Sequence, residues 1–199
     1  MMKKYYIPAL IFLILVSGMA YGQSAVQNYD VIHNDKVVGT TVVRKIGTDQ
    51  NFTISLNFSA DINFLIKRVV ILGKEHARFE NGVLKSGSVF RKANDKIKTD
   101  KSIKHLGSSY IVYDGDQRHV LQVGEIRNNM LSLFFNEPNN TITVYSDNQQ
   151  KLVNVKEAAP HKYIIPGKNE SNSTYIFKNG QCNMIILKSD LLTIKLVRK

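Results

Sequence analysis

The feature that most constrains the fold is a run of strict apolar–polar alternation at positions 52–64. Its apolar members are Phe52, Ile54, Leu56, Phe58, Ala60, Ile62 and Phe64, and one polar residue stands between each neighbouring pair. Successive side chains of a β-strand point to opposite faces, so the pattern predicts one long antiparallel strand with a buried and a solvated face. At roughly 3.4 Å per residue the run would span about 40 Å, so we expect a bend or bulge near residues 61–63.

Short turn signals separate the other apolar runs of the chain. Asn-Gly occurs at residues 81–82 and 179–180, Asn-Asp at 34–35 and 94–95, and Asp-Gly at 114–115. These pairs tolerate the positive φ that two-residue hairpin turns require. Because the signals recur throughout, the sequence predicts a mainly β protein. We expect a strongly curved antiparallel sheet, or a partly open β-barrel, built of hairpins with one short helix.

The helix is predicted where the two-residue period breaks. Three apolar residues recur at intervals of four: Ile126, Met130 and Phe134. Asn128 or Asn129 could cap the start and Pro138 ends the run, so we expect a helix over about residues 128–135. Because most of its surface is apolar, we expect it to pack as core at the open mouth or on the concave side of the sheet.

Residues 1–22 have the layout of a secretory signal peptide. Two lysines precede a mostly apolar stretch at residues 5–16, and Ala20 and Gly22 place small residues at the −3 and −1 positions of a cleavage site. The apolar stretch is shorter than the about 20 residues of a membrane span. We therefore expect cleavage, export to the periplasm or the exterior, and no transmembrane segment afterwards. Residues 23–199 would form a single β-rich domain.

The chain is basic, with a formal net charge of +11, and its apolar content of 43% is sufficient for a packed core. Basic residues are dispersed except in residues 91–104, the contact arm, six of which are Lys or Arg. Read as a hairpin, the contact arm is polar on both faces, so we expect it to project into solvent. It could be a lysine-rich edge or an electrostatic contact surface. No aromatic residue interleaves with its charges, and we expect no nucleic-acid partner.

The sequence contains no motif typical of an enzyme or a metal site. Its five histidines lack the spacings of local metal ligands, and no nucleophile elbow, phosphate-binding loop or dinucleotide-binding motif occurs. Asp114 and Asp116 flank Gly115, where a hairpin turn explains them better than acid–base chemistry. Cys182, the single cysteine, lies in an apolar segment typical of a buried strand. We predict no catalytic residue, no metal and no cofactor.

Short motifs distributed along the chain carry a resemblance to a known family. They are Tyr29-Asp30-Val31-Ile32 followed by Gly39, Phe79-Glu80-Asn81-Gly82-Val83-Leu84, the segment 130–138 with its terminal proline, Tyr145-Ser146-Asp147, and Tyr175-Ile176-Phe177-Lys178-Asn179-Gly180. Together they resemble secreted β-rich proteins of Gram-negative bacteria that are classed as a domain of unknown function. The resemblance implies an exported antiparallel sheet wrapped toward a barrel, and it implies no activity or site residue. The layout is also similar to periplasmic lipoprotein-carrier folds, where a curved sheet closed by a helix holds acyl chains.

Three functions are compatible with these observations. In the first, a non-enzymatic binding module encloses an apolar or lipid-like ligand in a cavity of several hundred Å³. Its candidate lining residues are Phe52, Ile54, Leu56, Phe58, Phe64, Met130 and Phe134. In the second, a structural or interaction protein with a filled interior contacts an anionic envelope polymer or a protein partner, with binding that weakens in salt. In the third, a hydrolase site assembles from separate strands. The first is favoured, and no signal indicates a particular oligomeric state.

Overall fold

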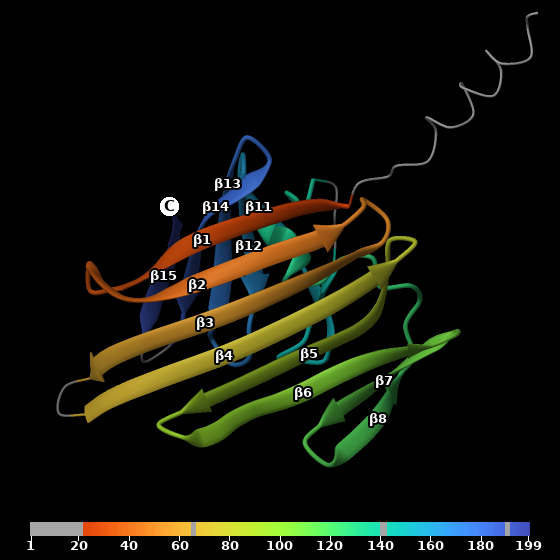
Figure 1. Ribbon diagram of the computed structural model, residues 1–199, viewed down its shortest axis with the longest axis horizontal. Coiled ribbons are helices and arrows are strands. Elements are labelled where there is room, and N and C mark those ends of the chain that lie inside the picture. Colours follow the sequence, from red (N-terminus) through yellow and green to blue (C-terminus); the bar gives the residue numbers. More distant parts are fainter. Residues whose placement is uncertain (1–21, 65–66, 140–142, 190–191) are drawn as a thin grey trace, which may run out of the picture.

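The computed structural model of the chain describes residues 22–64, 67–139, 143–189 and 192–199. The predicted signal peptide, apart from Gly22, lies outside these residues. Most of the described chain is β-strand (Figure 1). The elements are β1 Gln23–His33, β2 Lys36–Gly47, β3 Phe52–Phe64, β4 Lys67–Glu80, β5 Val83–Ala93, β6 Lys96–Leu106, β7 Ser109–Asp114, β8 Gln117–Leu121, the 3-10 helix η1 Ser132–Phe134, β9 Thr143–Ser146, β10 Lys151–Asn154, β11 Lys156–Ala159, β12 Lys162–Pro166, β13 Asn172–Lys178, β14 Gln181–Lys188 and β15 Thr193–Arg198.

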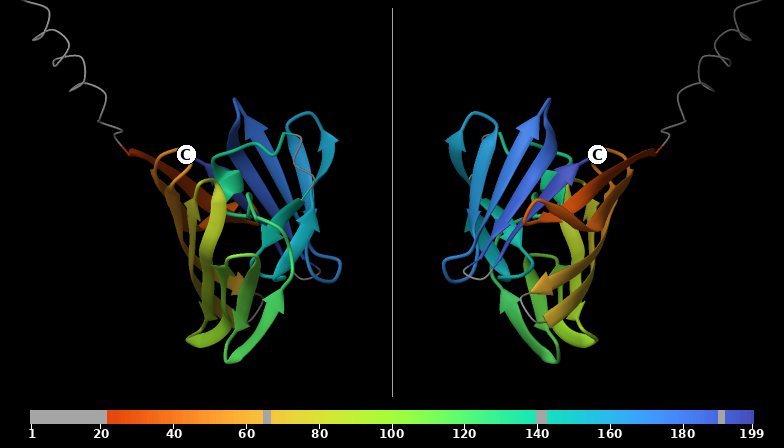
Figure 2. Two further views of the ribbon diagram at one scale, coloured as in Figure 1. Left: turned by 90° about the vertical axis from the view of Figure 1, so that its right-hand side faces the viewer. Right: turned by 90° about the vertical axis from the view of Figure 1, so that its left-hand side faces the viewer.

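Thirteen strands form one antiparallel sheet in the order β11-β12-β13-β14-β15-β1-β2-β3-β4-β5-β6-β7-β8, and β9 and β10 form a separate hairpin. The last strand pairs with the first, with Tyr29 opposite Arg198, so two meanders join in the middle of the sheet. The sheet bends until its two halves face each other across η1 and the β9–β10 hairpin (Figure 2). This open, strongly curved antiparallel sheet confirms the predicted fold class.

The strand β3 confirms the alternation that the sequence showed. Its apolar residues from Phe52 to Ile62 are buried or half-buried, and the polar residues between them are half-buried or exposed. A bend or bulge was expected near residues 61–63, but the register with β4 is constant along all of β3, so no bulge interrupts this pairing. Irregularities lie instead in neighbouring pairs, at Val31 of β1, Arg78 of β4 and Arg91 of β5. Bulges increase local twist and bend, so the strands around β3 carry the curvature.

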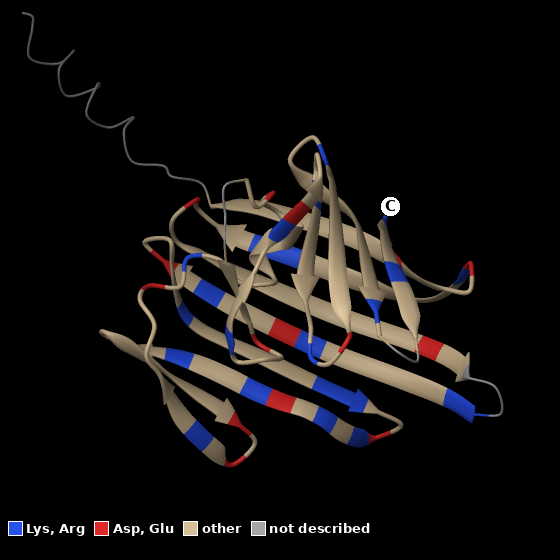
Figure 3. Cartoon of the chain, turned by 180° about the vertical axis from the view of Figure 1, so that it is seen from behind, with Lys and Arg blue, Asp and Glu red and all other residues tan. Residues whose placement is uncertain are grey.

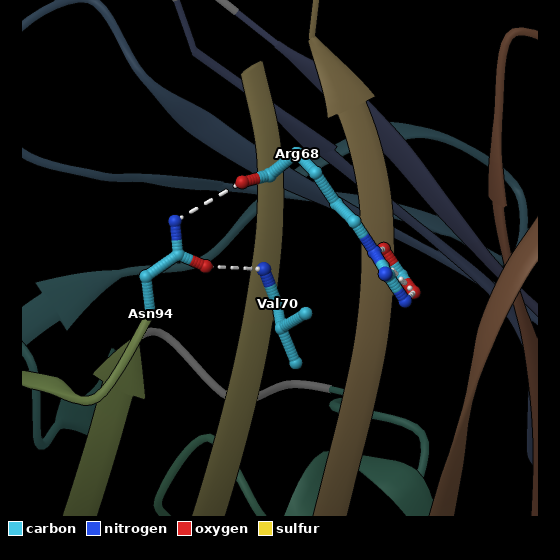
Figure 4. Close-up of polar contacts among 4 residues, drawn as sticks. Arg68, Val70 and Asn94 are labelled. Carbon is cyan, nitrogen blue, oxygen red and sulfur yellow. Dashed lines mark hydrogen bonds and ion pairs between the residues drawn. The ribbon is translucent and has the colours of Figure 1, made fainter.

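The turns follow the prediction closely. Both central residues have positive φ in four of them: Asn34 and Asp35, Asn81 and Gly82, Asn94 and Asp95, and Asn179 and Gly180. The Asn94 side chain also ties its turn to β4, because its Oδ1 accepts from Val70 N at 2.8 Å and its Nδ2 donates to Arg68 O at 3.0 Å (Figure 4). The hairpin of β5 and β6 is therefore held in the sheet. It does not stand apart from the sheet, although residues 94–98 at its tip are exposed to solvent.

The predicted helix is much shorter than expected, since η1 is a single turn at Ser132–Phe134. The residues before η1 form main-chain hydrogen bonds with β9. Met130 N donates to Tyr145 O at 3.1 Å, and Tyr145 N donates to Asn128 O at 2.9 Å. In a helix over residues 128–135 the Asn128 carbonyl would accept from Ser132 N, but it accepts from Tyr145 N instead, while Ser132 N donates to Asn129 O. The first α-helical bond is therefore not formed, which is consistent with the single 3-10 turn.

The apolar side chains of this segment nevertheless pack where we expected. Asn129 begins the turn, with its Oδ1 accepting from Ser132 N at 3.0 Å. Phe134 is buried, and its ring meets the Tyr29 ring edge to face with centroids 5.3 Å apart. The segment thus covers the concave side of the sheet and completes the core. Within the described ranges, no helix has the length and apolar character needed to cross a membrane.

Candidate functional site

A cavity of about 270 Å³ lies on the concave side of the sheet, between its two halves. Its walls come from β2 to β5 on one side, from β13 to β15 on the other, and from the segment that leads into η1. Many of the lining residues are apolar, among them Leu56, Phe58, Phe134, Ile185, Leu187 and Leu196. A concave, mostly apolar recess with a few polar groups is the usual construction of a small-molecule site.

The structure brings together some of the candidate residues and separates others. Four of them line the cavity: Leu56, Phe58, Met130 and Phe134. Phe52 and Ile54 share the inward face of β3 but lie farther along it, where Phe52 stacks on Phe79 with ring centroids 4.6 Å apart. They belong to the packed core and do not line the cavity. The side chain of Phe64 lies outside the described part of the chain.

The β4–β5 side of the cavity is charged. Glu75 of β4 and Arg91 of β5 both line it, and Nη2 of Arg91 forms an ion pair with Oε1 of Glu75. Nη1 of Arg91 donates to Asn148 Oδ1 at 2.8 Å. Lys101 of β6 is also largely buried and lies 2.9 Å from an Asp114 carboxylate oxygen. Arg91 and Lys101, two basic residues of the predicted contact arm, are therefore held in ion pairs at largely buried positions, and Lys92 forms an exposed ion pair with Asp95. Figure 3 shows the basic positions spread over several strands.

Asp147, just after β9, adds a buried carboxyl to the same side. Only 7% of its surface is exposed. A methyl group at Gly87 would lie 3.2 Å from Asp147 Oδ1, so the carboxyl sits closely over β5. Burial raises the pKa of Asp147 to about 7, and the nearby charge of Glu75 adds to the rise while Arg91 opposes it. This carboxyl can therefore gain or lose its proton near neutral pH, as groups at functional sites often do.

Two further polar groups face the cavity. Thr41 lies opposite Phe58 in the sheet, and its Oγ1 is fully buried without a hydrogen-bond partner in the described part of the chain. Tyr175 of β13 is also buried, and burial raises the pKa of its hydroxyl well above the usual range. A buried polar group without a partner costs about 1–3 kcal/mol. A bound molecule could supply the missing partner.

A second cavity of about 330 Å³ adjoins the first. Met130, Asn148, Ser173 and Leu187 line both. Beyond this boundary the lining includes Lys168 and Lys188, and it comes mainly from the ends of β12 and β14 and the loops that follow them. The two cavities together form a recess that leads from the core toward those loops.

Sequence reasoning did not identify the charged lining residues. A signal existed for Glu75, because it occupies the inward position of β4 that Ala77 and Phe79 share. Arg91 also occupies an inward position, because it lies two residues after the buried Val89 on β5. A charged side chain at a core position marks a buried partner or a functional site. Asp147 gave no such signal, since it follows a short strand in a turn.

Neither a metal-binding cluster nor a reactive thiol is found among the described residues. Within the described residues, no three His, Cys, Asp or Glu side chains gather closely enough to hold a metal ion. Asp114 pairs with Lys101, and Asp116 is exposed in the following turn. Cys182 is buried, which confirms the prediction for this thiol, and burial raises its pKa to about 12. Such a thiol stays protonated and unreactive.

These features define a class of protein: an open, strongly curved antiparallel sheet with a largely apolar pocket on its concave side. A sequence model of the family described as "Domain of unknown function (DUF6134)" matches residues 29–199. The chain belongs to this family, which confirms the resemblance to a domain of unknown function. The match runs from within β1 to the end of β15 and so includes every residue that lines the pocket. No curated protein matches the chain.

Proposed function

We propose that this protein is a binding module whose concave pocket holds a small ligand with an apolar body. The observation that carries the proposal is the cavity of about 270 Å³, whose lining includes Leu56, Phe58 and Phe134. Ligand pockets typically measure about 300–1,000 Å³. The first cavity approaches this range, and the adjoining recess of about 330 Å³ extends it.

The volume sets the size of the ligand and its affinity. At roughly 30 Å³ per water-sized group, the first cavity holds about nine non-hydrogen atoms. Eight buried carbons at about 0.8 kcal/mol each give a gross gain of about 6 kcal/mol, part of which offsets the cost of association. Because about 6 kcal/mol corresponds to about 40 μM, a probe such as 1-octanol should then bind with a dissociation constant between about 40 μM and 1 mM.

The test fills the pocket with a larger side chain. Leu187 lines both cavities, so Leu187→Trp should occupy the space and weaken 1-octanol binding at least about tenfold in a calorimetric titration. Leu106 at the end of β6 is 47% exposed and lies outside both linings, so Leu106→Trp is the matched control and should bind like the wild type. Circular dichroism of both variants checks that the sheet is intact.

Native mass spectrometry of protein purified from its own cells gives an independent test. We expect a copurified apolar or lipid-like molecule, which solvent extraction identifies, and we expect Leu187→Trp to lack it. Protein that carries no such molecule and binds no 1-octanol would overturn the proposed function.

The sequence of residues 1–22 supports a site of action outside the cytoplasm, because it has the layout of a secretory signal peptide. We infer that the protein meets its ligand after export. Comparing the protein content of the periplasmic, extracellular and cytoplasmic fractions tests this part of the proposal, and a purely cytoplasmic protein of full length would contradict it.

A further inference from the structure

The charges that line the pocket do not balance. In the first cavity, Glu75 and Asp147 supply two carboxyl groups, while among its described lining residues the basic side chain is Arg91 alone. Lys168 and Lys188 line only the adjoining recess. Arg91 already forms an ion pair with Glu75 and donates to Asn148. In the described part of the chain, no basic nitrogen lies within 4.0 Å of the Asp147 carboxyl. Once ionised, Asp147 is therefore a buried negative charge without an ion-pair partner.

Thr41 is a second and independent indication that the pocket receives a polar group. Its Oγ1 is fully buried, has no partner in the described chain, and belongs to a residue that lines the same cavity as Asp147. A hydroxyl can accept a hydrogen bond, and an ionised carboxylate can only accept. The pocket thus offers acceptors to a ligand that brings hydrogen-bond donors.

We propose that the ligand is a cationic amphiphile, in which an ammonium group pairs with the Asp147 carboxylate while a short apolar chain contacts Leu56 and Phe134. This inference rests on the proposed function, because it names the chemical class that the same pocket selects. An anionic head group would instead place a third negative charge beside one guanidinium that is already engaged. A buried charge is costly unless it is paired, which disfavours that arrangement.

The proposal includes a pH dependence. Besides burial, the groups that act on the Asp147 carboxyl are Glu75 of β4, its own main-chain N–H, Arg91 of β5 and the Asn129 side chain, and all but Glu75 lower its pKa. The charge of Asp147 in turn raises the pKa of the Tyr145 hydroxyl of β9. Burial holds the pKa of Asp147 near 7 in the empty pocket. An alkylammonium group, like that of Lys, stays charged well above neutral pH, so only the carboxyl changes between pH 6 and 8. Amine binding should therefore be about tenfold weaker at pH 6 than at pH 8.

The experiment compares three probes of equal chain length on the full chain: octylamine, 1-octanol and octanoate. Calorimetric titration at pH 8 should show octylamine binding at least about tenfold more tightly than the other two. Asp147→Asn should remove this preference and keep the 1-octanol affinity. The exposed turn residue Asp116 is the control, and Asp116→Asn should retain the preference. If Asp147→Asn fails to fold, the octylamine affinity of the wild type at pH 6 and at pH 8 tests the proposal instead.

The outcomes separate this inference from the function it rests on. Octanoate or 1-octanol binding as tightly as octylamine would overturn the cationic ligand and leave the binding function standing. The same holds if octylamine affinity is equal at pH 6 and pH 8, or if Asp147→Asn keeps the amine preference. If none of the three probes binds and no copurified molecule is found, the binding function itself fails.

Discussion

Replacing Asp147 by asparagine should stabilise the protein at neutral pH and leave its stability in acid nearly unchanged. Burial raises the pKa of this carboxyl from 3.8 to about 7. Between these pH values the native state keeps the proton and the unfolded state has lost it, so the unfolding free energy falls as the pH rises. At about 1.4 kcal/mol per pKa unit, ionisation of Asp147 lowers the unfolding free energy of the wild type by about 4 kcal/mol at pH 8.

Urea unfolding at pH 4, 6 and 8 measures the effect. Asparagine is nearly isosteric and stays neutral, so Asp147→Asn should lack the decline and exceed the wild type by about 4 kcal/mol at pH 8. The two proteins should differ little at pH 4. Asp116→Asn, in an exposed turn, should follow the wild type throughout. If Asp147→Asn is instead less stable at pH 8 than the wild type, the ionised carboxylate stabilises the fold and the reasoning is refuted.

Two further substitutions test the packing of the pocket. Gly87→Ala should cost about 1–3 kcal/mol in urea unfolding, because its methyl group would lie 3.1 Å from Ile103 Cγ2 and 3.2 Å from Asp147 Oδ1. Gly124→Ala, where nothing lies within 4 Å, should cost far less, and equal costs would contradict the close packing. Arg91→Met leaves a largely buried carboxylate unpaired and should cost about 2 kcal/mol or more. Lys92→Met, whose ion pair is exposed, should cost below about 1 kcal/mol; a similar loss in both would show that the Arg91 pair contributes little.

The strands and turns of this protein could be predicted because their signals are local. Alternation in residues 52–64 defines which side of β3 faces the core, and that assignment does not depend on which strands lie beside it. Asn-Gly and Asn-Asp pairs need positive φ wherever they occur, so they mark hairpins without tertiary information. The open curved sheet follows from consecutive hairpins that share one apolar face.

Two of the departures from the expected fold arose where distant strands compete for local groups. The spacing of Met130 and Phe134 favoured a helix, but the Asn128 carbonyl, which the first turn of that helix needs, accepts a hydrogen bond from Tyr145 N instead. The contact arm looked like a solvated hairpin. In the structure, Arg91 pairs with Glu75 and Lys101 pairs with Asp114, which places basic side chains at inward positions.

The sequence by itself determined that this chain forms a curved antiparallel sheet with an apolar concave face. The alternation of apolar and polar residues and the positive φ of turn residues are both local signals that extend over only a few positions. Only the tertiary structure decided what lies on that face. Glu75, Arg91, Asp147 and Tyr175 come from four separate segments, and their pairing and proton affinity depend on distances and burial that exist only after the two halves of the sheet have closed toward each other. The pocket is therefore a property of the folded chain.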